Sequence, residues 1–162
     1  MSEKFYSSGL DKVDLKLLDA LQQDASLSNQ QLADTACISP ATCMRRVKRL
    51  KDEGFIEKRV AILSPDKLGH NLIAIVEITL DRQAAELLDA FEDKVTDDPE
   101  VQQCYRVSSG PDFILVAHVC DMAAYHALAN RLFNMDSNVR NVRTFFSVKR
   151  AKFGGRIILG KM

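Results

Sequence analysis

Residues 39–54 read SPATCMRRVKRLKDEG, and this stretch decides how the first half of the chain folds. Ser39 is a natural N-cap, Pro40 occupies the first helical position where its missing N–H costs nothing, and Gly54 falls where a left-handed C-cap is wanted. The stretch carries five positive charges and no acid before Asp52. The sequence therefore predicts a helix with clean ends that is built to lie on a polyanion.

The two sides of this helix differ in chemistry. At about 100° per residue, Cys43, Val47 and Leu50 fall on one side, which suits a core. On the opposite side, two arginines and a small polar residue suit base edges in a major groove, with flanking cations on phosphates. The predicted base contacts are Thr42, Arg45 and Arg49, and the other predicted DNA-binding residues are Ser28, Asn29, Ser39, Arg46 and Lys48.

The segments before this helix supply a context that a merely solvated basic helix would lack. Ser28 and Gln31 have the spacing of a capping box, which predicts a second helix beginning there. Asp11 can cap a first helix that ends near Asp24 and carries apolar residues at helical spacing. Three short helices of which the last is basic describe a helix-turn-helix.

Residues 55–63 read FIEKRVAIL and are followed by the turn signal Ser64-Pro65-Asp66. Alternation of apolar and polar side chains is typical of a strand. The sequence therefore predicts a strand that forms the wing of a winged helix-turn-helix.

The composition excludes little by itself, because the formal net charge of the 162 residues is zero. This length allows one or two small domains. Positive charge is local: besides the basic helix, a C-terminal tail has several cations and no acidic residue after Asp136. The N-terminus lacks a hydrophobic signal segment, and no apolar run is long enough to span a bilayer. We therefore expect a cytoplasmic protein without a membrane partner.

Reactive side chains form no recognisable catalytic or metal-binding pattern. The cysteines make no Cys-x-x-Cys pair, which favours reduced thiols. They are Cys37, Cys43, Cys104 and Cys120. His118 and Cys120 would share a strand face, with His126 further on, but a fourth ligand is missing and packing is the preferred interpretation. We find no catalytic triad, glycine-rich phosphate loop or paired-carboxylate motif, and we predict no catalytic residue, metal or cofactor.

The second half of the chain alternates strand-like and helical patterns. The expected elements are strands at 72–80, 101–108, 113–120 and 139–149 and helices at 84–95 and 121–133. Within the second helix, Met122, Tyr125 and Leu128 have the spacing of core residues. The order strand, helix, strand, strand, helix, strand is the split βαβ arrangement, an α+β fold in which both helices cover one face of a four-stranded antiparallel sheet.

The last expected strand has apolar residues on both faces, with Phe146 on one and Phe145 on the other. A sheet face that its own helices leave uncovered, and that still carries apolar residues, implies a partner sheet. The sequence therefore predicts self-association.

A winged helix-turn-helix joined to a split βαβ domain resembles the leucine-responsive regulator and asparagine-regulator (Lrp/AsnC) family of transcription factors. The similar strings are LDKVD at 10–14, LA at 32–33, ISP at 38–40, RVKRL at 46–50, EGFI at 53–56 and VEI at 76–78. The resemblance runs from about Leu10 to Leu159. It implies a winged helix-turn-helix DNA-binding domain over 1–63, a linker over 64–71, and a ferredoxin-like ligand-binding and oligomerisation domain with a basic tail over 72–162.

The resemblance implies double-stranded DNA as a partner, a homodimer that assembles to a tetramer or octamer, and a small effector, usually an amino acid, bound between dimers. By position, the effector-binding residues are Tyr105, Ser108, Ser109, Gly110, Asp112, Met122, Thr144, Phe145 and Ser147. The turn would offer backbone N–H groups to an α-carboxylate, and Asp112 would meet the ammonium. An apolar and aromatic lining without a second carboxylate favours a neutral amino acid.

The sequence departs from the family at the turn that usually reads Gly, any residue, Tyr or Phe, Asp. Here the same positions are Ser109, Gly110, Pro111 and Asp112, so the acid is kept and the aromatic is lost. Pro111 removes an N–H and stiffens the loop. Two interpretations stay open: the change alters the pocket, or it merely sets a different hairpin turn.

Three functions fit this reading of the chain. One is a sequence-specific transcription regulator that responds to a small effector. Another is an architectural DNA-binding protein of the same fold with a vestigial pocket. The third is an enzyme similar to sirohaem decarboxylases, which share the two-domain plan. Outward arginines on a well-capped helix argue against the enzyme, because a decarboxylase has no need for them.

Overall fold

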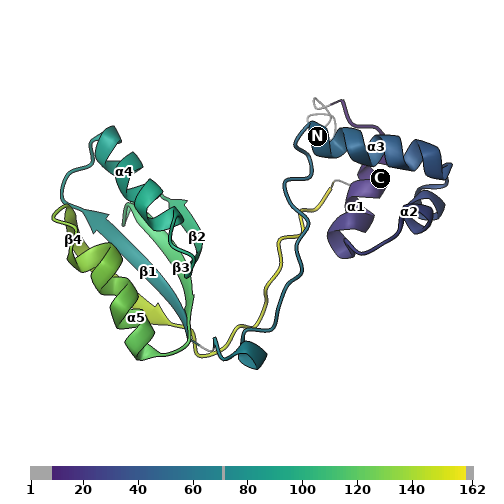
Figure 1. Ribbon diagram of the computed structural model, residues 1–162. Helices are drawn as coiled ribbons and strands as arrows, with labels where there is room; N and C mark the ends of the chain where they lie inside the picture. The colour runs from purple at the N-terminus through teal and green to yellow at the C-terminus, as the bar shows by residue number, and fades with distance from the viewer. Residues whose placement is uncertain (1–8, 71, 160–162) are drawn as a thin grey trace. The chain divides into compact units, whose positions relative to one another are not determined.

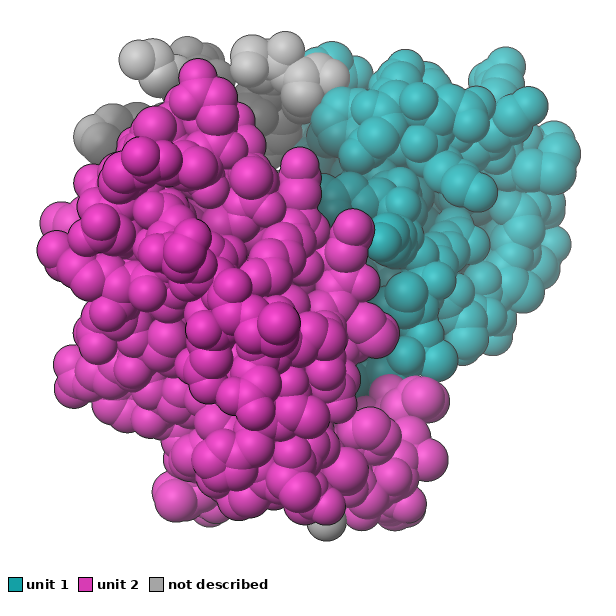
Figure 2. Space-filling view, turned by 60° about the vertical axis from the view of Figure 1, so that its left-hand side comes forward, with its two compact units in different colours: residues 1–62, 153–162 teal, residues 63–152 magenta. Residues whose placement is uncertain are grey.

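A computed structural model describes residues 9–70 and 72–159 of the chain. The chain divides into two compact units, coloured separately in Figure 2. Met1–Ile62 and Phe153–Met162 form the first, here named the helical unit, and Leu63–Lys152 form the second, the sheet unit. This grouping differs from the expected domain boundaries, because the described tail residues after 152 belong with the helical unit and not with the sheet.

Three helices build the helical unit (Figure 1). They are α1 (Lys12–Gln23), α2 (Asn29–Ala36) and α3 (Pro40–Asp52). Each begins where the sequence predicts, because the side chains of Asp11, Ser28 and Ser39 accept hydrogen bonds from backbone N–H groups of the first turn. Gly54 follows α3 with a φ of 79°, the left-handed conformation expected of it.

The apolar faces of the three helices meet in one core. Its buried members are Leu17, Leu21, Leu32, Ala33, Ala36, Cys43 and Leu50. Val47 is partly buried against this cluster, so the predicted inward side of α3 is confirmed. Removing this apolar surface from water is what holds three short helices together, since none is long enough to be stable alone.

Residues 55–63 form no strand, although all of them lie in the described part of the chain. The predicted wing strand is therefore wrong. Alternating side chains satisfy only half of what a strand requires, because the backbone N–H and C=O groups also need a partner ladder. The side chains of Val60 and Ile62 are 69% and 67% exposed. We refer to residues 55–63 as the arm.

The tail returns to α1. The Gln22 side chain donates from Nε2 to the carbonyl oxygen of Ile157 at 2.8 Å and accepts from the N–H of the same residue at 2.9 Å. Arg156 forms an ion pair with Asp19 at 3.0 Å. A hollow of about 470 Å³ is lined by α1, the arm and this tail. The helical unit is therefore completed by residues from the far end of the chain.

The sheet unit has the predicted order of elements. They are β1 (Leu72–Leu80), α4 (Ala85–Thr96), β2 (Val101–Arg106), β3 (Phe113–Val119), α5 (Met122–Ala129) and β4 (Val139–Phe146). The strands lie in the order β2-β3-β1-β4, and each neighbouring pair is antiparallel. The predicted split βαβ fold is confirmed. A 3-10 turn, η1 (Asp66–Leu68), precedes β1.

Both helices of the sheet unit cover the same face of the sheet (Figure 1). The rings of Phe91 on α4 and Phe113 on β3 lie 5.0 Å apart within this core. Met122 was expected in the core and is 44% exposed instead. It is the first residue of α5, and the buried residues of this helix begin one turn later, at Tyr125. At the other end, a π-helical turn, η2 (Asn130–Asn134), buries additional apolar side chains.

The opposite face of the sheet carries a row of apolar side chains. Strand register pairs Ile75 of β1 with Val116 of β3 on one side and with Phe145 of β4 on the other. Ile75 is 37% exposed and Phe145 41%. Phe146 points the other way and meets the Tyr125 ring edge-on at 5.0 Å. Phe146 and Phe145 therefore lie on opposite faces of β4 as predicted, and self-association through the uncovered face stays a prediction.

All four cysteines are free thiols. Burial raises the pKa of the Cys43 and Cys104 thiols, so both are poor nucleophiles. Among the helices of the described residues, none has the length and apolar character needed to cross a membrane.

Candidate functional site

The N-terminal ends of α2 and α3 are joined by a side-chain hydrogen bond. Asn29 Nδ2 donates to the carbonyl oxygen of Pro40 at 2.8 Å. Ser39 Oγ accepts from the Thr42 N–H at 3.2 Å and lies 2.8 Å from the Thr42 hydroxyl. Ser28 caps the neighbouring helix and is exposed, as are Asn29 and Ser39. Four of the predicted DNA-binding residues are therefore brought together on one surface.

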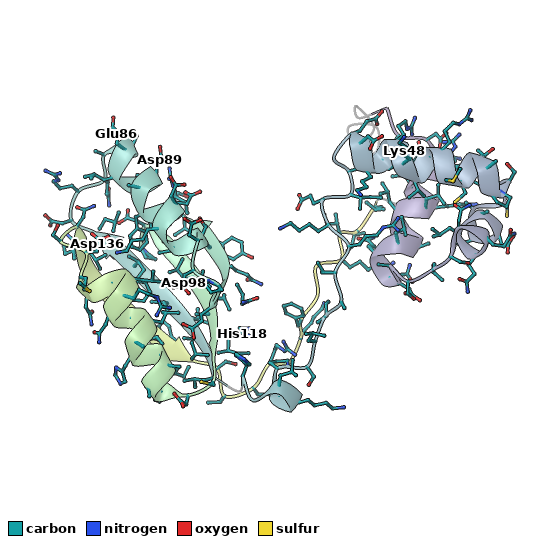
Figure 3. All side chains as sticks on the ribbon, viewed as in Figure 1. Lys48, Glu86, Asp89, Asp98, His118 and Asp136 are labelled. Carbon is teal, nitrogen blue, oxygen red and sulfur yellow. The ribbon has the colours of Figure 1, made fainter. Side chains whose placement is uncertain are left out.

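Arg45 and Lys48 extend this surface along α3. Both side chains are exposed, and Figure 3 labels Lys48 on this helix. The first turn of α3 contains no acidic residue. Unpaired N–H groups at a helix N-terminus together with nearby cations attract anionic oxygen atoms, including those of phosphates.

The side chain of Arg49 does not point outward as predicted. Its Nη2 lies 2.6 Å from Asp14 Oδ2, on α1. Arg46 shares this partner, with Nη1 2.9 Å from Asp14 Oδ1 and 2.6 Å from Asp11 Oδ2. The helical period places Arg46 about 60° from Cys43 and so beside the edge of α3 that meets α1, whereas Arg49 lies about 120° away and reaches the Asp14 carboxylate through the length of its side chain.

This cluster of two acids and two arginines is strongly held. Asp14 is completely buried, and its carboxylate also closes the capping box of α1 by accepting from the Asp11 N–H. The backbone N–H of Asp14, followed by the Arg46 guanidinium, keeps the pKa of Asp11 below its ordinary value. Hydrogen bonds to Asp11 and Asp14 raise the pKa of Arg46. The cluster therefore fastens α3 to α1 by charge-assisted hydrogen bonds.

Sequence reasoning missed the role of Asp14. A signal for it exists, since Asp14 precedes Leu17 by three residues and Leu21 by seven, and so shares their buried face of α1. An acid on the apolar face of a helix requires a cationic partner from another element, because an unpaired buried charge is very costly.

In the sheet unit, the β2–β3 turn is organised by Asp112. Its Oδ2 accepts from the Leu80 N–H at 2.7 Å, and its own N–H donates to the Ile78 carbonyl oxygen at 2.8 Å. Ser109 and Gly110 have positive φ values of 64° and 106°. A carboxylate accepts more than one hydrogen bond, so the contact with Leu80 leaves capacity for another donor.

The other predicted effector-binding residues are distributed over the sheet. Tyr105 lies on β2 and Phe145 on β4, which are opposite edges of the sheet. Thr144 faces the helices, where its hydroxyl makes a short hydrogen bond with the Tyr125 hydroxyl. Ser147 follows β4 and donates its N–H to the Ile73 carbonyl oxygen.

Met122 lies at the opposite end of β3 from the turn formed by Ser108, Ser109, Gly110 and Asp112. The turn precedes β3 and Met122 follows it, and the seven residues of that strand span roughly 20 Å. One copy of the chain therefore does not gather the nine predicted effector-binding residues into one pocket.

The His118 and Cys120 pair offers no metal centre. Within residues 9–70 and 72–159, no group of three or more His, Cys, Asp or Glu side chains is placed to hold a metal ion. Burial, followed by the positive charges of Arg150 and His70, lowers the pKa of His118, whose position is labelled in Figure 3.

Two family models match the chain. Residues 10–57 match a winged helix-turn-helix DNA-binding domain, and residues 73–157 match the Lrp/AsnC ligand binding domain. Together they account for both units and for the two candidate sites described above.

Individual proteins are similar over nearly the whole chain. An uncharacterized HTH-type transcriptional regulator of Haemophilus influenzae is 38% identical, with 93% of this chain and 89% of that protein covered. The leucine-responsive regulatory protein of Escherichia coli is 34% identical, with 98% and 96% covered. Among solved structures, a transcriptional regulator of Neisseria meningitidis in complex with L-Met is 30% identical, with a TM-score of 0.85 and 93% and 97% covered.

Proposed function

This chain belongs to the Lrp/AsnC family of transcriptional regulators, and on that premise we propose that it binds operator DNA through α3 and responds to a neutral amino acid. A regulator of this kind acts where the DNA is, which makes the cytoplasm its place of action. Family membership also disfavours the decarboxylase-like alternative, because the relatives described above are transcriptional regulators.

The exposed N-terminal end of α3 is the observation that carries the DNA-binding proposal. It is held to α2 by the hydrogen bond from Asn29 to Pro40 and capped by Ser39, which contacts Thr42, and Ser28 caps the neighbouring α2. We assign Arg45 and Thr42 to base edges, and Lys48 with the small polar residues to the DNA backbone. The charges of Arg46 and Arg49 are already engaged by α1, so we assign them to holding α3 in place.

Operator binding by Arg45→Ala tests this assignment. We expect a loss of about 1–3 kcal/mol on the operator and relaxed discrimination against mismatched sites, whereas Lys48→Ala should weaken binding to all sequences alike. Fluorescence anisotropy with operator and scrambled duplexes measures both effects. Lys16→Ala, which removes an exposed cation from α1, is the matched control. Unchanged operator affinity in a folded Arg45→Ala protein would remove Arg45 from the interface.

We also propose that the chain works as a dimer or a multiple of dimers. The row of Val116, Ile75 and Phe145 leaves apolar surface uncovered on the sheet, and a partner sheet would bury it. A two-fold dimer would present two α3 helices to half-sites roughly one helical turn apart. Light scattering checks this, and a strict monomer at micromolar concentration would contradict it. Tetramer and octamer are the assemblies to distinguish.

The amino-acid effector is proposed from three supports. The sheet unit matches a ligand-binding domain, the Neisseria meningitidis protein binds L-Met, and Asp112 is a carboxylate beside a turn that exposes backbone. Because one chain leaves the nine predicted residues dispersed, a complete pocket requires a second copy. The ligand would then shift assembly through its differential affinity for the assembled state.

Calorimetry with L-methionine, L-leucine and L-lysine tests the effector and its polarity. We expect a neutral amino acid to bind best and Asp112→Asn to weaken it markedly, because the ammonium would lose its charged partner. A preference for lysine, or equal binding by Asp112→Asn, would overturn the proposed pocket. A complete absence of binding across a thermal-shift panel of the common amino acids would favour the architectural function instead.

A further inference from the structure

Asp14 joins the first helix to the DNA-facing helix through two guanidinium groups. Its side chain is completely buried. Oδ1 lies 2.9 Å from Arg46 Nη1, and Oδ2 lies 2.6 Å from Arg49 Nη2. Asp11 completes the cluster at 2.6 Å from Arg46. These four side chains carry two negative and two positive charges, and Glu53 lies 3.9 Å from Arg49 Nε as a further, more distant acid.

The cluster changes the charge that α3 presents to a polyanion. Of its five cations, Arg46 and Arg49 are compensated within 3 Å, while Arg45 and Lys48 are exposed. Yet Arg46 and Arg49 are not sealed from solvent, since their side chains are 26% and 41% exposed. Both guanidiniums would therefore be available to phosphates if the carboxylates of Asp14 and Asp11 did not bind them.

We propose that Asp14 is a positioning residue for DNA recognition, which withholds Arg46 and Arg49 from phosphates and thereby keeps affinity for non-specific DNA low. This inference rests on the proposed DNA-binding function. Fastened to α1, the two arginines fix the orientation of α3, and discrimination between sequences falls to Arg45 and Thr42. A cation that moves freely along the backbone would add affinity for every sequence equally.

The salt dependence of binding reports how many cations reach phosphates. Each phosphate contact releases counterions and adds about 0.9 to the slope of log affinity against log salt concentration. If the charge of Asp14 is removed, Arg46 keeps only its ion pair with the exposed Asp11 and Arg49 only a longer one with Glu53 at 3.9 Å, so both guanidiniums become more available for such contacts. The slope should then steepen by roughly one to two, and non-specific binding should tighten several-fold at low salt.

Asp14→Asn is the decisive variant, because it removes the charge and keeps the shape and a hydrogen-bond acceptor. Affinity is measured for the operator and for a scrambled duplex between about 50 and 200 mM salt. We expect a steeper slope on both duplexes, tighter binding to the scrambled one and a smaller specificity ratio. Asp34→Asn is the matched control, since it removes an equal charge from an exposed position on α2. Its slope should equal that of the unmodified protein.

Two double variants identify the released cations. Each combines Asp14→Asn with a neutral substitution of one arginine, Arg46→Gln or Arg49→Gln. Each should lose part of the added slope. In the unmodified background, Arg49→Gln should leave the slope on scrambled DNA unchanged, because a withheld cation makes no phosphate contact. This second measurement stands even when Asp14→Asn fails to fold.

Two outcomes would overturn the proposal. One is a folded Asp14→Asn protein that loses affinity for both duplexes with an unchanged slope, which is the signature of a purely structural role. The other is a shallower slope on scrambled DNA for Arg49→Gln alone. A protein that binds no duplex at all, in a selection from random sequence, would refute the proposed function, which is a distinguishable result.

Discussion

The helical unit and the sheet unit each organise their candidate site around one aspartate, but the two carboxylates bind different donors. Asp14 accepts from the guanidiniums of Arg46 and Arg49. Asp112 accepts from the backbone N–H of Leu80, at the end of a central strand. A flexible guanidinium can leave its carboxylate and bind another anion, such as a phosphate. A backbone N–H is fixed in position as long as the sheet is folded. The first site is therefore open to electrostatic adjustment and the second is tied to strand register.

The two sites also differ in completeness. The residues proposed for the DNA interface lie on neighbouring turns of capped helices, so one chain assembles them. The predicted effector residues lie at both ends and on both faces of the sheet. A site on two packed helices is complete when the helices pack, while a site spread over a sheet requires further surfaces.

The largest expected effects come from truncating the two cores. Phe113→Ala should destabilise the sheet unit by about 3–5 kcal/mol, and Leu50→Ala the helical unit by about 2–5 kcal/mol, since both side chains are fully buried. Amide hydrogen exchange, read separately for each unit, measures the losses. Because the two cores share no buried residue among those described, equal loss in both units from either substitution would contradict their separation.

Asp112→Ala should cost about 1–3 kcal/mol in the free energy of unfolding, because it leaves the Leu80 N–H without its partner at a residue that is 1% exposed. Asp112→Asn retains an acceptor oxygen and should cost less. Urea denaturation measures the pair. If Asp112→Ala proves as stable as Asp112→Asn, the turn does not depend on this hydrogen bond. The comparison with Asp14 would then lack a structural role for Asp112.

Gly110→Ala should destabilise the β2–β3 turn by about 1–2 kcal/mol, because a φ of 106° is strained for any residue with a Cβ. The space around Gly110 is open, so the cost is one of backbone conformation and not of contact. Gly154→Ala, where the surroundings are equally open and φ is not positive, is the control and should change stability by less than about 0.5 kcal/mol. Equal losses of stability from Gly110→Ala and Gly154→Ala would show that the positive φ of Gly110 imposes no extra cost on alanine.

The smallest expected effect is on the pH dependence of the sheet unit. Burial lowers the pKa of His118, so the folded state keeps this imidazole neutral where the unfolded chain already binds a proton. The associated stability is fully present above about pH 6.5 and is lost as the pH falls through the lowered value. Denaturation between pH 5 and 8 should show this slope, and His118→Gln should flatten it. An opposite slope would show that His118 gains an anionic partner.

Local signals account for what the sequence predicts well. The capping residues Asp11, Ser28 and Ser39 and the left-handed Gly54 act within one turn of the chain, and each was identified correctly. The six elements of the sheet unit were likewise visible, because a buried strand and an amphipathic helix each carry their own periodicity.

The failures share a different cause, since each depends on a partner that is remote in sequence. Arg49 turns toward α1 because a buried carboxylate lies 35 residues earlier. The arm alternates like a strand but has no ladder to join. The predicted effector-binding residues are a separate case, because no single residue encodes the strand order that spreads them over one copy of the chain, and their assembly with a second copy stays a prediction.

The return of the tail to α1 has a consequence for the order in which the protein is made. Ribosomes deliver chains from the N-terminus, and domains generally fold as they emerge. The three helices and their core are available early, but the partners of Asp19 and Gln22 are translated only after the whole sheet unit. The helical core of the DNA-binding part can thus fold first, but its contacts with the tail form last. Until the sheet unit has been synthesised, the face of α1 that carries Asp19 and Gln22 stays accessible to chaperones.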